Sequence, residues 1–105
     1  MRFVETPIFT REVCNLLEDK DYRSLQLALL LRPEQGVLIP GSNGLRKLRW
    51  GQKEKIKRGG CRVIYYWDRK METFYMLFVY PKSRQEYLTP AQIKKLSKLV
   101  KEEFK

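Results

Sequence analysis

Residues 73–80, TFYMLFVY, are apolar or aromatic at every position after the first. Because successive side chains of a strand point to opposite faces of its sheet, this run places apolar groups on both faces. A strand of that kind has to be covered from two sides. The run therefore predicts a central strand that is buried on both faces, and the remaining elements have to supply the cover.

Two more strands are expected beside it, over residues 45–50 and 58–67. Only residues 68–72 connect the second of these to the central strand. A link that short is typical of a hairpin, so this pair is predicted to be antiparallel. Residues 33–44 contain two prolines and three glycines and are expected to form a loop, and residues 3–4 can begin an edge strand.

Helices are predicted from their end signals and their apolar spacing. Thr6 followed by proline is a typical helix start, and the apolar residues of 7–18 repeat at helical spacing. A second helix is expected to be capped by Asp19 or Asp21 and to end before Pro33. Residues 89–92, Thr-Pro-Ala-Gln, form a capping-box pattern that starts the last helix. The apolar stripe expected on that helix comprises Ile93, Leu96, Val100 and Phe104.

These elements predict one α+β domain over residues 1–105, with an N-terminal helical hairpin packed on a small antiparallel β-sheet and a C-terminal helix. A hydrophobic content of 43% and a charged content of 32% are those of a folded globular chain. The sequence contains no apolar run of the roughly 18 residues that a membrane span needs. It also begins without the apolar segment of a signal peptide. A cytoplasmic location without a membrane partner is therefore expected.

Positive charge is concentrated in the middle of the chain. Residues 41–70 carry ten basic and two acidic residues, a balance of +8 within a net charge of +10. Charge confined to one segment indicates an anionic partner, most often nucleic acid, because crowded like charges repel each other. A solvated lysine loop is the alternative interpretation of the lysines in this cluster. The cluster comprises Arg46, Lys47, Arg49, Lys53, Lys55, Lys57, Arg58 and Arg62. Glu54 is the only acidic residue between the first and the last of them.

Arg62 lies inside a predicted strand, on the face that also carries Ile64 and Tyr66. It is there either as part of a structural ion pair or as a cation held in a fixed position over a groove. The strand favours the second interpretation, since a functional cation gains from a fixed position. Lys82 occupies a comparable place just past the central strand, and Arg84 follows in the same loop.

Three further features leave two interpretations each. Gly59-Gly60 suits a tight turn or close approach to a phosphate, and the turn is favoured. Tyr87 can stack on a nucleic-acid base or pack under the last helix. Cys14 and Cys61 are expected to be buried, reduced thiols, although basic neighbours would make Cys61 more reactive by lowering its pKa.

The chain contains no histidine. This excludes a histidine acid–base pair and the serine–histidine and cysteine–histidine nucleophile systems. The acidic residues form no dense cluster of the kind that a two-metal nuclease uses, so neither metal nor cofactor is expected, with Glu54, Glu72 and Glu86 left open individually. Nuclease chemistry would then use lysine, arginine and tyrosine, because fixed guanidinium groups stabilise charge on a phosphorane.

Three segments resemble the RelE superfamily of bacterial toxins: GLRKLR at 44–49, KIKRGGCRVIYYW at 55–67 and FYMLFVYPKSRQEYLT at 74–89. The HigB branch is the most similar, with a run of the form LRK…KRGG-x-R-x-x-YY followed by a strand that ends in Tyr-x-Lys. The resemblance covers residues 44–100 by motif and the N-terminal helices by architecture only. It implies a RelE/ParE-like fold and a ribosome-dependent mRNA endonuclease, the toxin of a type II toxin–antitoxin pair.

The resemblance also implies a mechanism, in which a 2′-hydroxyl of mRNA in the ribosomal A site attacks the adjacent phosphate without a metal. Arg62 would stabilise the transition state. The absence of histidine leaves the proton transfers unassigned. Many relatives have glycine at the position of Pro81, so the direction in which the Lys82 side chain points is also left open. We favour Lys55 or Lys57 as base and Lys82 or Arg84 as donor. The catalytic residues expected are thus Arg62, Lys82, Lys55 and Lys57. The RNA-binding residues expected are Arg46, Lys47, Arg49, Lys53, Arg58, Arg84 and Tyr87.

The partners implied are mRNA, the ribosome and an antitoxin encoded nearby, with operator DNA reached only through the antitoxin complex. One alternative is a ParE-like gyrase inhibitor, which shares the architecture but generally lacks this set of arginines and lysines. The other alternative is a nucleic-acid-binding module without enzymatic activity. Codon preference and the mode of antitoxin inhibition are left open.

Overall fold

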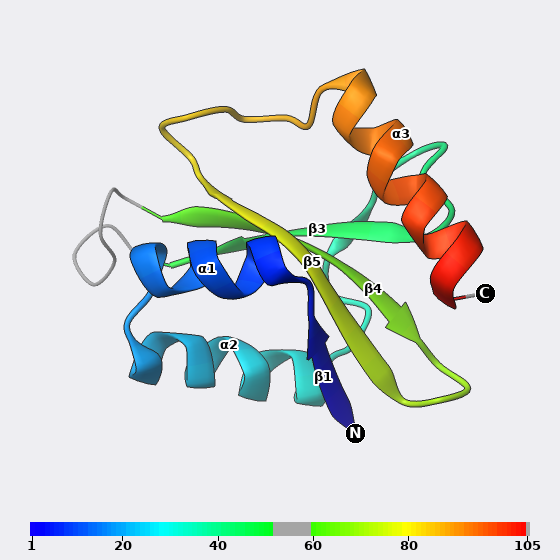
Figure 1. Ribbon diagram of the computed structural model, residues 1–105. Coiled ribbons are helices and arrows are strands. Elements are labelled where there is room, and N and C mark those ends of the chain that lie inside the picture. Colours follow the sequence, from blue (N-terminus) through cyan, green and yellow to red (C-terminus); the bar gives the residue numbers. More distant parts are fainter. Residues whose placement is uncertain (52–59, 105) are drawn as a thin grey trace.

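The structure is a computed structural model that describes residues 1–51 and 60–104, with residues 103 and 104 described by their backbone alone. In this part of the chain five strands form one sheet in the order β1-β5-β4-β3-β2 (Figure 1). The strands are β1 (Arg2–Glu5), β2 (Val37–Leu38), β3 (Leu45–Trp50), β4 (Cys61–Asp68) and β5 (Thr73–Pro81).

The strand pairing confirms one expectation and corrects two. The β4–β5 hairpin is antiparallel as predicted, with Arg62 opposite Tyr80. The prediction of an antiparallel sheet is wrong at its edge, because β1 runs parallel to β5, with Arg2 opposite Thr73. Helices separate β1 from the other strands, so no tight turn forces it to be antiparallel. The predicted loop over 33–44 also contains the short β2, which pairs with β3.

The helices are α1 (Pro7–Leu16), α2 (Asp19–Leu31) and α3 (Pro90–Leu99), and α3 continues into the π-helical turn η2 (Val100–Phe104). Thr6 caps α1 as predicted, because its Oγ1 accepts a hydrogen bond from the Phe9 amide at 3.2 Å. The predicted capping box of Thr89 and Gln92 is present at the start of α3. α1 ends before the predicted residue 18, since Leu17 is extended and buries its side chain. No helix in the described part of the chain is long and apolar enough to cross a membrane.

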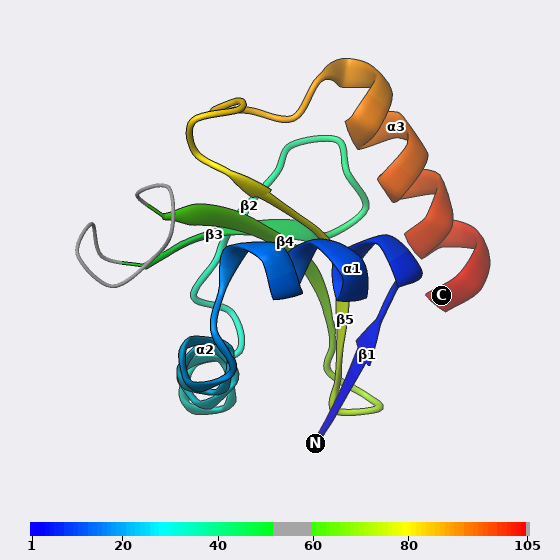
Figure 2. The same cartoon turned by 60° about the vertical axis from the view of Figure 1, so that its left-hand side comes forward.

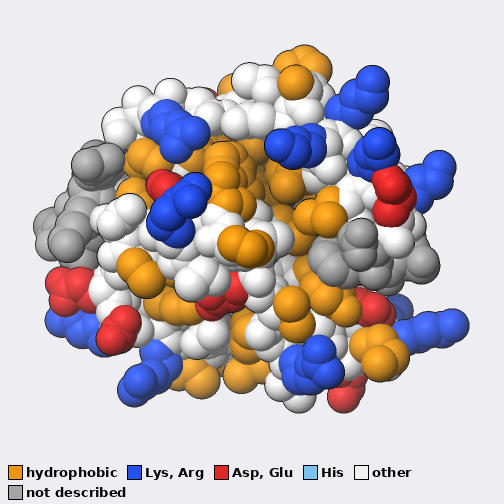
Figure 3. Space-filling view, viewed as in Figure 1, with side chains coloured by type: hydrophobic (Ala, Val, Ile, Leu, Met, Phe, Trp, Pro, Cys, Tyr) orange, Lys and Arg blue, Asp and Glu red, His pale blue; other side chains and the backbone are white. Residues whose placement is uncertain are grey.

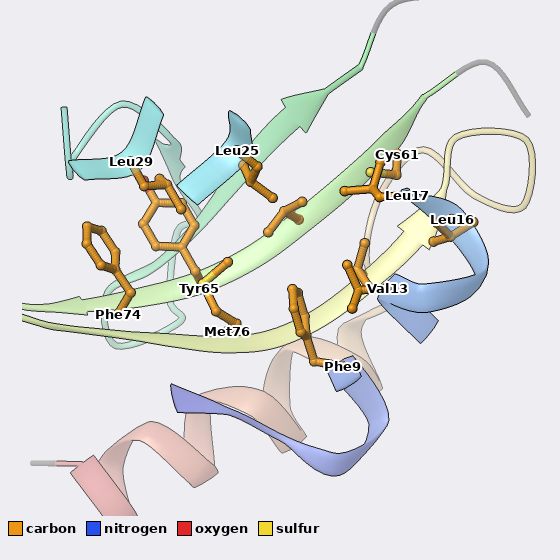
Figure 4. Close-up of a cluster of buried hydrophobic side chains, with 12 residues drawn as sticks. Phe9, Val13, Leu16, Leu17, Leu25, Leu29, Cys61, Tyr65, Phe74 and Met76 are labelled. Carbon is orange, nitrogen blue, oxygen red and sulfur yellow. The ribbon is translucent and has the colours of Figure 1, made fainter. Parts of the chain in front are cut away.

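The helices cover both faces of the sheet. α1 and α2 pack on one face of the sheet (Figures 1 and 2). The buried side chains on this face (Figure 4) include Phe9, Val13, Leu25, Leu29, Cys61, Val63, Tyr65 and Met76. α3 packs on the other face, where the buried cluster includes Leu45, Ile64, Leu77, Phe78 and Tyr80. β5 contributes to both clusters, which confirms that it is an inner strand covered from two sides.

A β-bulge in β5 changes which of its side chains reach α3. Ile64 pairs with Phe78 and the next residue, Tyr65, pairs with Met76, so Leu77 is an extra residue. Leu77 and Phe78 consequently both belong to the α3 cluster. In the residues beyond the bulge, the side chains of β5 that would have faced one side of the sheet face the other. The end of β5 is thereby oriented as the site described below requires.

Tyr65 connects the loop after α2 to the sheet. Its buried hydroxyl accepts a hydrogen bond from the Gly36 amide at 3.0 Å and donates one to the Pro33 carbonyl at 2.8 Å. A Cβ at Gly36 would lie 2.8 Å from the Tyr65 ring, so the close approach requires glycine. Both contacts position the segment that leads into β2.

Replacing Tyr65 by phenylalanine is expected to lower the free energy of unfolding by about 1–3 kcal/mol, because the buried Gly36 amide loses its partner. Urea denaturation measures the change. Tyr87→Phe, at a side chain that is 70% exposed, serves as the matched control and should change stability by less than about 0.5 kcal/mol. Equal losses in the two variants would contradict the role given to the Tyr65 hydroxyl.

Candidate functional site

Two arginines face each other across neighbouring strands. Arg49 of β3 is the direct cross-strand partner of Arg62 of β4, and Tyr80 of β5 is the partner of Arg62 on its other side. Cross-strand partners share a face of the sheet, and Ile64 and Tyr80 assign this one to α3. Like charges placed directly opposite each other destabilise a sheet. The pair therefore requires an anion close by.

Glu86, in the loop between β5 and α3, supplies that anion. Its carboxylate accepts hydrogen bonds from Nε and Nη2 of Arg62 at 3.0 and 3.2 Å, and Nη2 also approaches the other oxygen at 2.7 Å. Nη2 of Arg49 lies 3.5 Å from the same carboxylate. The Tyr80 hydroxyl donates to the Glu86 backbone carbonyl at 3.3 Å, which ties the loop to the end of β5. The bulge in β5 is what brings Tyr80 to this face.

The Arg62–Glu86 pair is buried at one end and accessible at the other. The side chain of Arg62 is 7% exposed, whereas that of Glu86 is 40% exposed. Desolvation by itself would raise the pKa of the Glu86 carboxyl, but the hydrogen bond and charge of Arg62, aided by Arg49 and Lys47, lower it below its usual value. Glu86 is therefore ionised at neutral pH, and Arg62 adopts the ion-pair arrangement that was the less favoured interpretation of its sequence position.

Lys47 and Tyr87 meet next to this cluster. Nζ of Lys47 lies 4.4 Å from the centroid of the Tyr87 ring, a cation–π contact. Tyr87 is 70% exposed, so it does not pack under α3, and its ring is accessible for stacking. The two residues also line an apolar pocket of about 310 Å³. The other residues that line this pocket are Val37, Leu38, Ile39, Pro40, Leu88 and Ile93.

Arg46 is not brought together with this cluster. It neighbours Lys47 in β3 and consequently points to the opposite face of the sheet. There its Nη1 donates to the carbonyls of Gly36 at 2.8 Å and Glu34 at 3.0 Å. Its side chain is 16% exposed and contributes to holding the loop before β2. Of the predicted RNA-binding arginines in β3, only Arg49 shares a face with Arg62.

The predicted residues after β5 lie in an exposed loop. The backbone amide of Lys82 donates to the Gly60 carbonyl at 3.2 Å, which holds the start of this loop beside the start of β4. Gly60 has a φ of 108°, and a Cβ there would lie 3.2 Å from the Trp50 carbonyl oxygen, so the backbone conformation favours glycine at this position. Lys82 and Arg84 are both exposed. Lys53, Lys55, Lys57, Arg58 and Gly59 lie outside the described residues.

Arg84 borders a second apolar region. It lines a pocket of about 260 Å³ together with Ile8, Phe78 and Leu96, between the start of α1 and α3. Figure 3 shows apolar side chains above α1, beneath the loop that precedes α3. Lys and Arg side chains gather over α3 in the same view, in agreement with the exposed Lys94, Lys95, Lys98 and Lys101.

Glu86 is the site residue whose role the sequence did not reveal. It follows Arg62 by 24 residues, in a loop without helical or strand periodicity. The only signal was its acidic character within a basic region, which does not identify a partner. Among residues 1–51 and 60–102, no three His, Cys, Asp or Glu side chains are grouped so that they could hold a metal ion. The described residues of the site carry guanidinium, ammonium, carboxylate and phenol groups.

The fold can be compared with known proteins. No protein-family model matches the chain. Among solved structures, it is similar to a double arginine-to-alanine mutant of the E. coli toxin RelE in the free state, with a TM-score of 0.60. The chain has a RelE-like fold. The likeness covers 89% of this chain and 93% of RelE at 14% sequence identity, so it concerns the fold alone. This supports the expected RelE-like architecture, and membership of the RelE superfamily and of its HigB branch stays a prediction.

Cys61 precedes Arg62 and is fully buried in the cluster beneath α1 and α2 of the RelE-like fold. Desolvation raises the pKa of its thiol to about 11, although the charge of Arg62 acts in the opposite direction. The alternative of a reactive Cys61 is therefore wrong. Cys14 is exposed, which corrects the expectation that both thiols are buried.

At neutral pH, Cys14 should react readily with a disulfide reagent such as dithiobis-nitrobenzoate, whereas Cys61 should react only after unfolding. The physical reason is the raised pKa and the buried position of the Cys61 thiol. Thiol titration with and without guanidinium chloride measures the reactivity of both cysteines. A Cys14→Ser variant shows which of the two thiols reacts slowly. Fast reaction of the native Cys14→Ser protein would contradict the burial of Cys61.

Proposed function

We propose that this protein is the mRNA-cleaving toxin of a type II toxin–antitoxin system, acting on mRNA in the ribosomal A site. The observation that carries the proposal is Arg62, a guanidinium held in one position on a RelE-like sheet with a second arginine, Arg49, at its side. RNA cleavage through a phosphorane places extra negative charge on the phosphate oxygens in the transition state. A cation fixed at that point stabilises this charge without reorganising during the reaction.

In the proposed reaction, the 2′-hydroxyl of one nucleotide attacks the adjacent phosphorus, and the bond from phosphorus to the 5′-oxygen of the next nucleotide breaks. The products are a 2′,3′-cyclic phosphate and a free 5′-hydroxyl. Arg62 binds the non-bridging oxygens, while Lys47 and Arg49, on the same face, neutralise neighbouring phosphates. The accessible ring of Tyr87 stacks on a base beside the cleaved bond.

The proton transfers require other groups, because the chain contains no histidine. Lys55 or Lys57 is proposed as the base that accepts the 2′-hydroxyl proton, on the basis of the sequence alone. Lys82 or Arg84 is proposed as the donor to the departing 5′-oxygen. The exposed position of both residues, in the loop that also carries Glu86, supports this assignment.

The proposed partners follow from this activity. The toxin would bind ribosomes and mRNA in the cytoplasm, and an antitoxin encoded nearby would hold it inactive. Operator DNA would be bound only by the complex with the antitoxin. A HigB-like assignment within the RelE superfamily rests on the motifs around the KRGG-x-R run.

Arg62→Ala is expected to lower cleavage of ribosome-bound mRNA by about 100-fold to 1,000-fold, the usual effect of removing one group that stabilises a transition-state anion. Growth after induction and mapping of mRNA 5′ ends measure the effect. Because Arg62 is buried, thermal unfolding has to confirm that the variant is folded. Arg62→Lys, which keeps the charge but loses the bidentate geometry, provides a milder second variant and should also be impaired.

The control is Arg23→Ala, which removes an exposed arginine from α2 and should leave growth arrest and cleavage unchanged. Full toxicity of folded Arg62→Ala would contradict the proposal. A gyrase inhibitor would instead reduce DNA supercoiling without new mRNA 5′ ends. A simple nucleic-acid-binding module would show salt-sensitive binding without either effect.

A further inference from the structure

We propose that the Glu86 carboxylate occupies the position of an RNA phosphate in the free protein, and that a phosphodiester binds Arg62 and Arg49 by displacing it. The inference rests on the proposed function in one respect, since RNA is taken as the ligand. It adds a binding step that the proposed reaction by itself does not contain. It also gives Glu86 a role, as a competitor within the protein for its own anion-binding site.

The contacts of Arg62 show why a phosphate has to take the place of Glu86. Nε and Nη2 both donate to the Glu86 carboxylate, and Nη1 lies 3.5 Å from the carbonyl oxygen of Cys61. All three guanidinium nitrogens thus have partners, on a side chain that is 7% exposed. Carboxylate and phosphate oxygens fit the same fork of guanidinium donors. A phosphate can gain this bidentate contact only where the carboxylate now lies.

Arg62 and Glu86 differ in how readily each can move out of the ion pair. Arg62 is fixed by its strand, with Arg49 and Tyr80 on either side. Glu86 lies in the β5–α3 loop, and its side chain is 40% exposed. A change of its side-chain rotamer would move the carboxylate into water, where it is well solvated. The exchange therefore leaves the cation in place and replaces only its anion.

The charge balance of the site favours an anionic replacement. Without Glu86, Arg49 and Arg62 would repel each other as direct cross-strand neighbours. Glu86 offsets this repulsion in the free protein, since it lies within 3.5 Å of both guanidinium groups. A phosphodiester carries the same single negative charge and has two non-bridging oxygens. It can consequently take over both contacts.

Binding of a fluorescently labelled 2′-O-methyl oligoribonucleotide, measured without ribosomes, tests the inference. This probe lacks the attacking hydroxyl and cannot be cleaved, so binding is separated from turnover. Glu86→Gln removes the competing charge and is expected to bind the probe roughly tenfold more tightly than the wild type, or better. Fluorescence anisotropy at fixed salt gives both dissociation constants.

Glu34→Gln is the matched control. It also removes one negative charge and one arginine partner, because Glu34 lies 3.5 Å from Arg46, but it does so on the opposite face of the sheet. Its effect on affinity measures the general gain from a higher net charge. A gain in Glu86→Gln that does not exceed the gain in Glu34→Gln overturns the inference. Weaker binding by Glu86→Gln also overturns it, because Glu86 would then orient Arg62 for the ligand.

A double variant identifies the site of competition. In an Arg62→Ala background, replacing Glu86 by glutamine should bring a clearly smaller gain than it does in the presence of Arg62, since only Arg49 is left at the contested position. An equal or larger gain without Arg62 contradicts displacement at Arg62. These binding results are independent of cleavage: a wild-type protein that binds the probe competitively but cuts no mRNA would refute the proposed function alone. Failure of every variant to bind the probe would refute the inference.

Discussion

The burial of β5 on both faces is the constraint on which the rest of this structure depends. An inner strand with apolar groups on both sides requires two covering layers, and α1 with α2 provides one while α3 provides the other. The bulge at Leu77 gives α3 two adjacent side chains of β5 and reverses the alternation that follows. Tyr80 thereby reaches the α3 face and borders the site at the end of the strand.

The same constraint explains how an arginine can lie within this core. Arg62 belongs to a strand with apolar neighbours on both faces, and burying its charge alone would be strongly unfavourable. Glu86 compensates from a loop that Tyr80 holds at the strand end. The ion pair therefore connects stability with the proposed activity, since one guanidinium belongs to the folded core and is also the proposed phosphate ligand.

The elements that were predicted correctly have local causes. Thr6 and Thr89 form their caps with residues a few positions away, and the β4–β5 hairpin follows from a short link between two apolar runs. Two of the errors concern strand pairing, namely the parallel β1, which pairs with a strand about 70 residues away, and the short β2 within the predicted loop. The separation of Arg46 from Arg62 depends on the register between β3 and β4. A basic cluster read along the chain cannot show that its members divide between two faces.

The amino-acid sequence by itself determined the helix starts, the buried hairpin, the concentration of positive charge and the absence of histidine, because these depend on neighbouring residues or on composition. Only the tertiary structure decided that Arg49 joins Arg62, that Arg46 does not, and that Glu86 completes the group. The physical reason is that strand register and loop placement depend on packing between distant segments. A carboxylate 24 residues from its arginine has no local signal to connect the two.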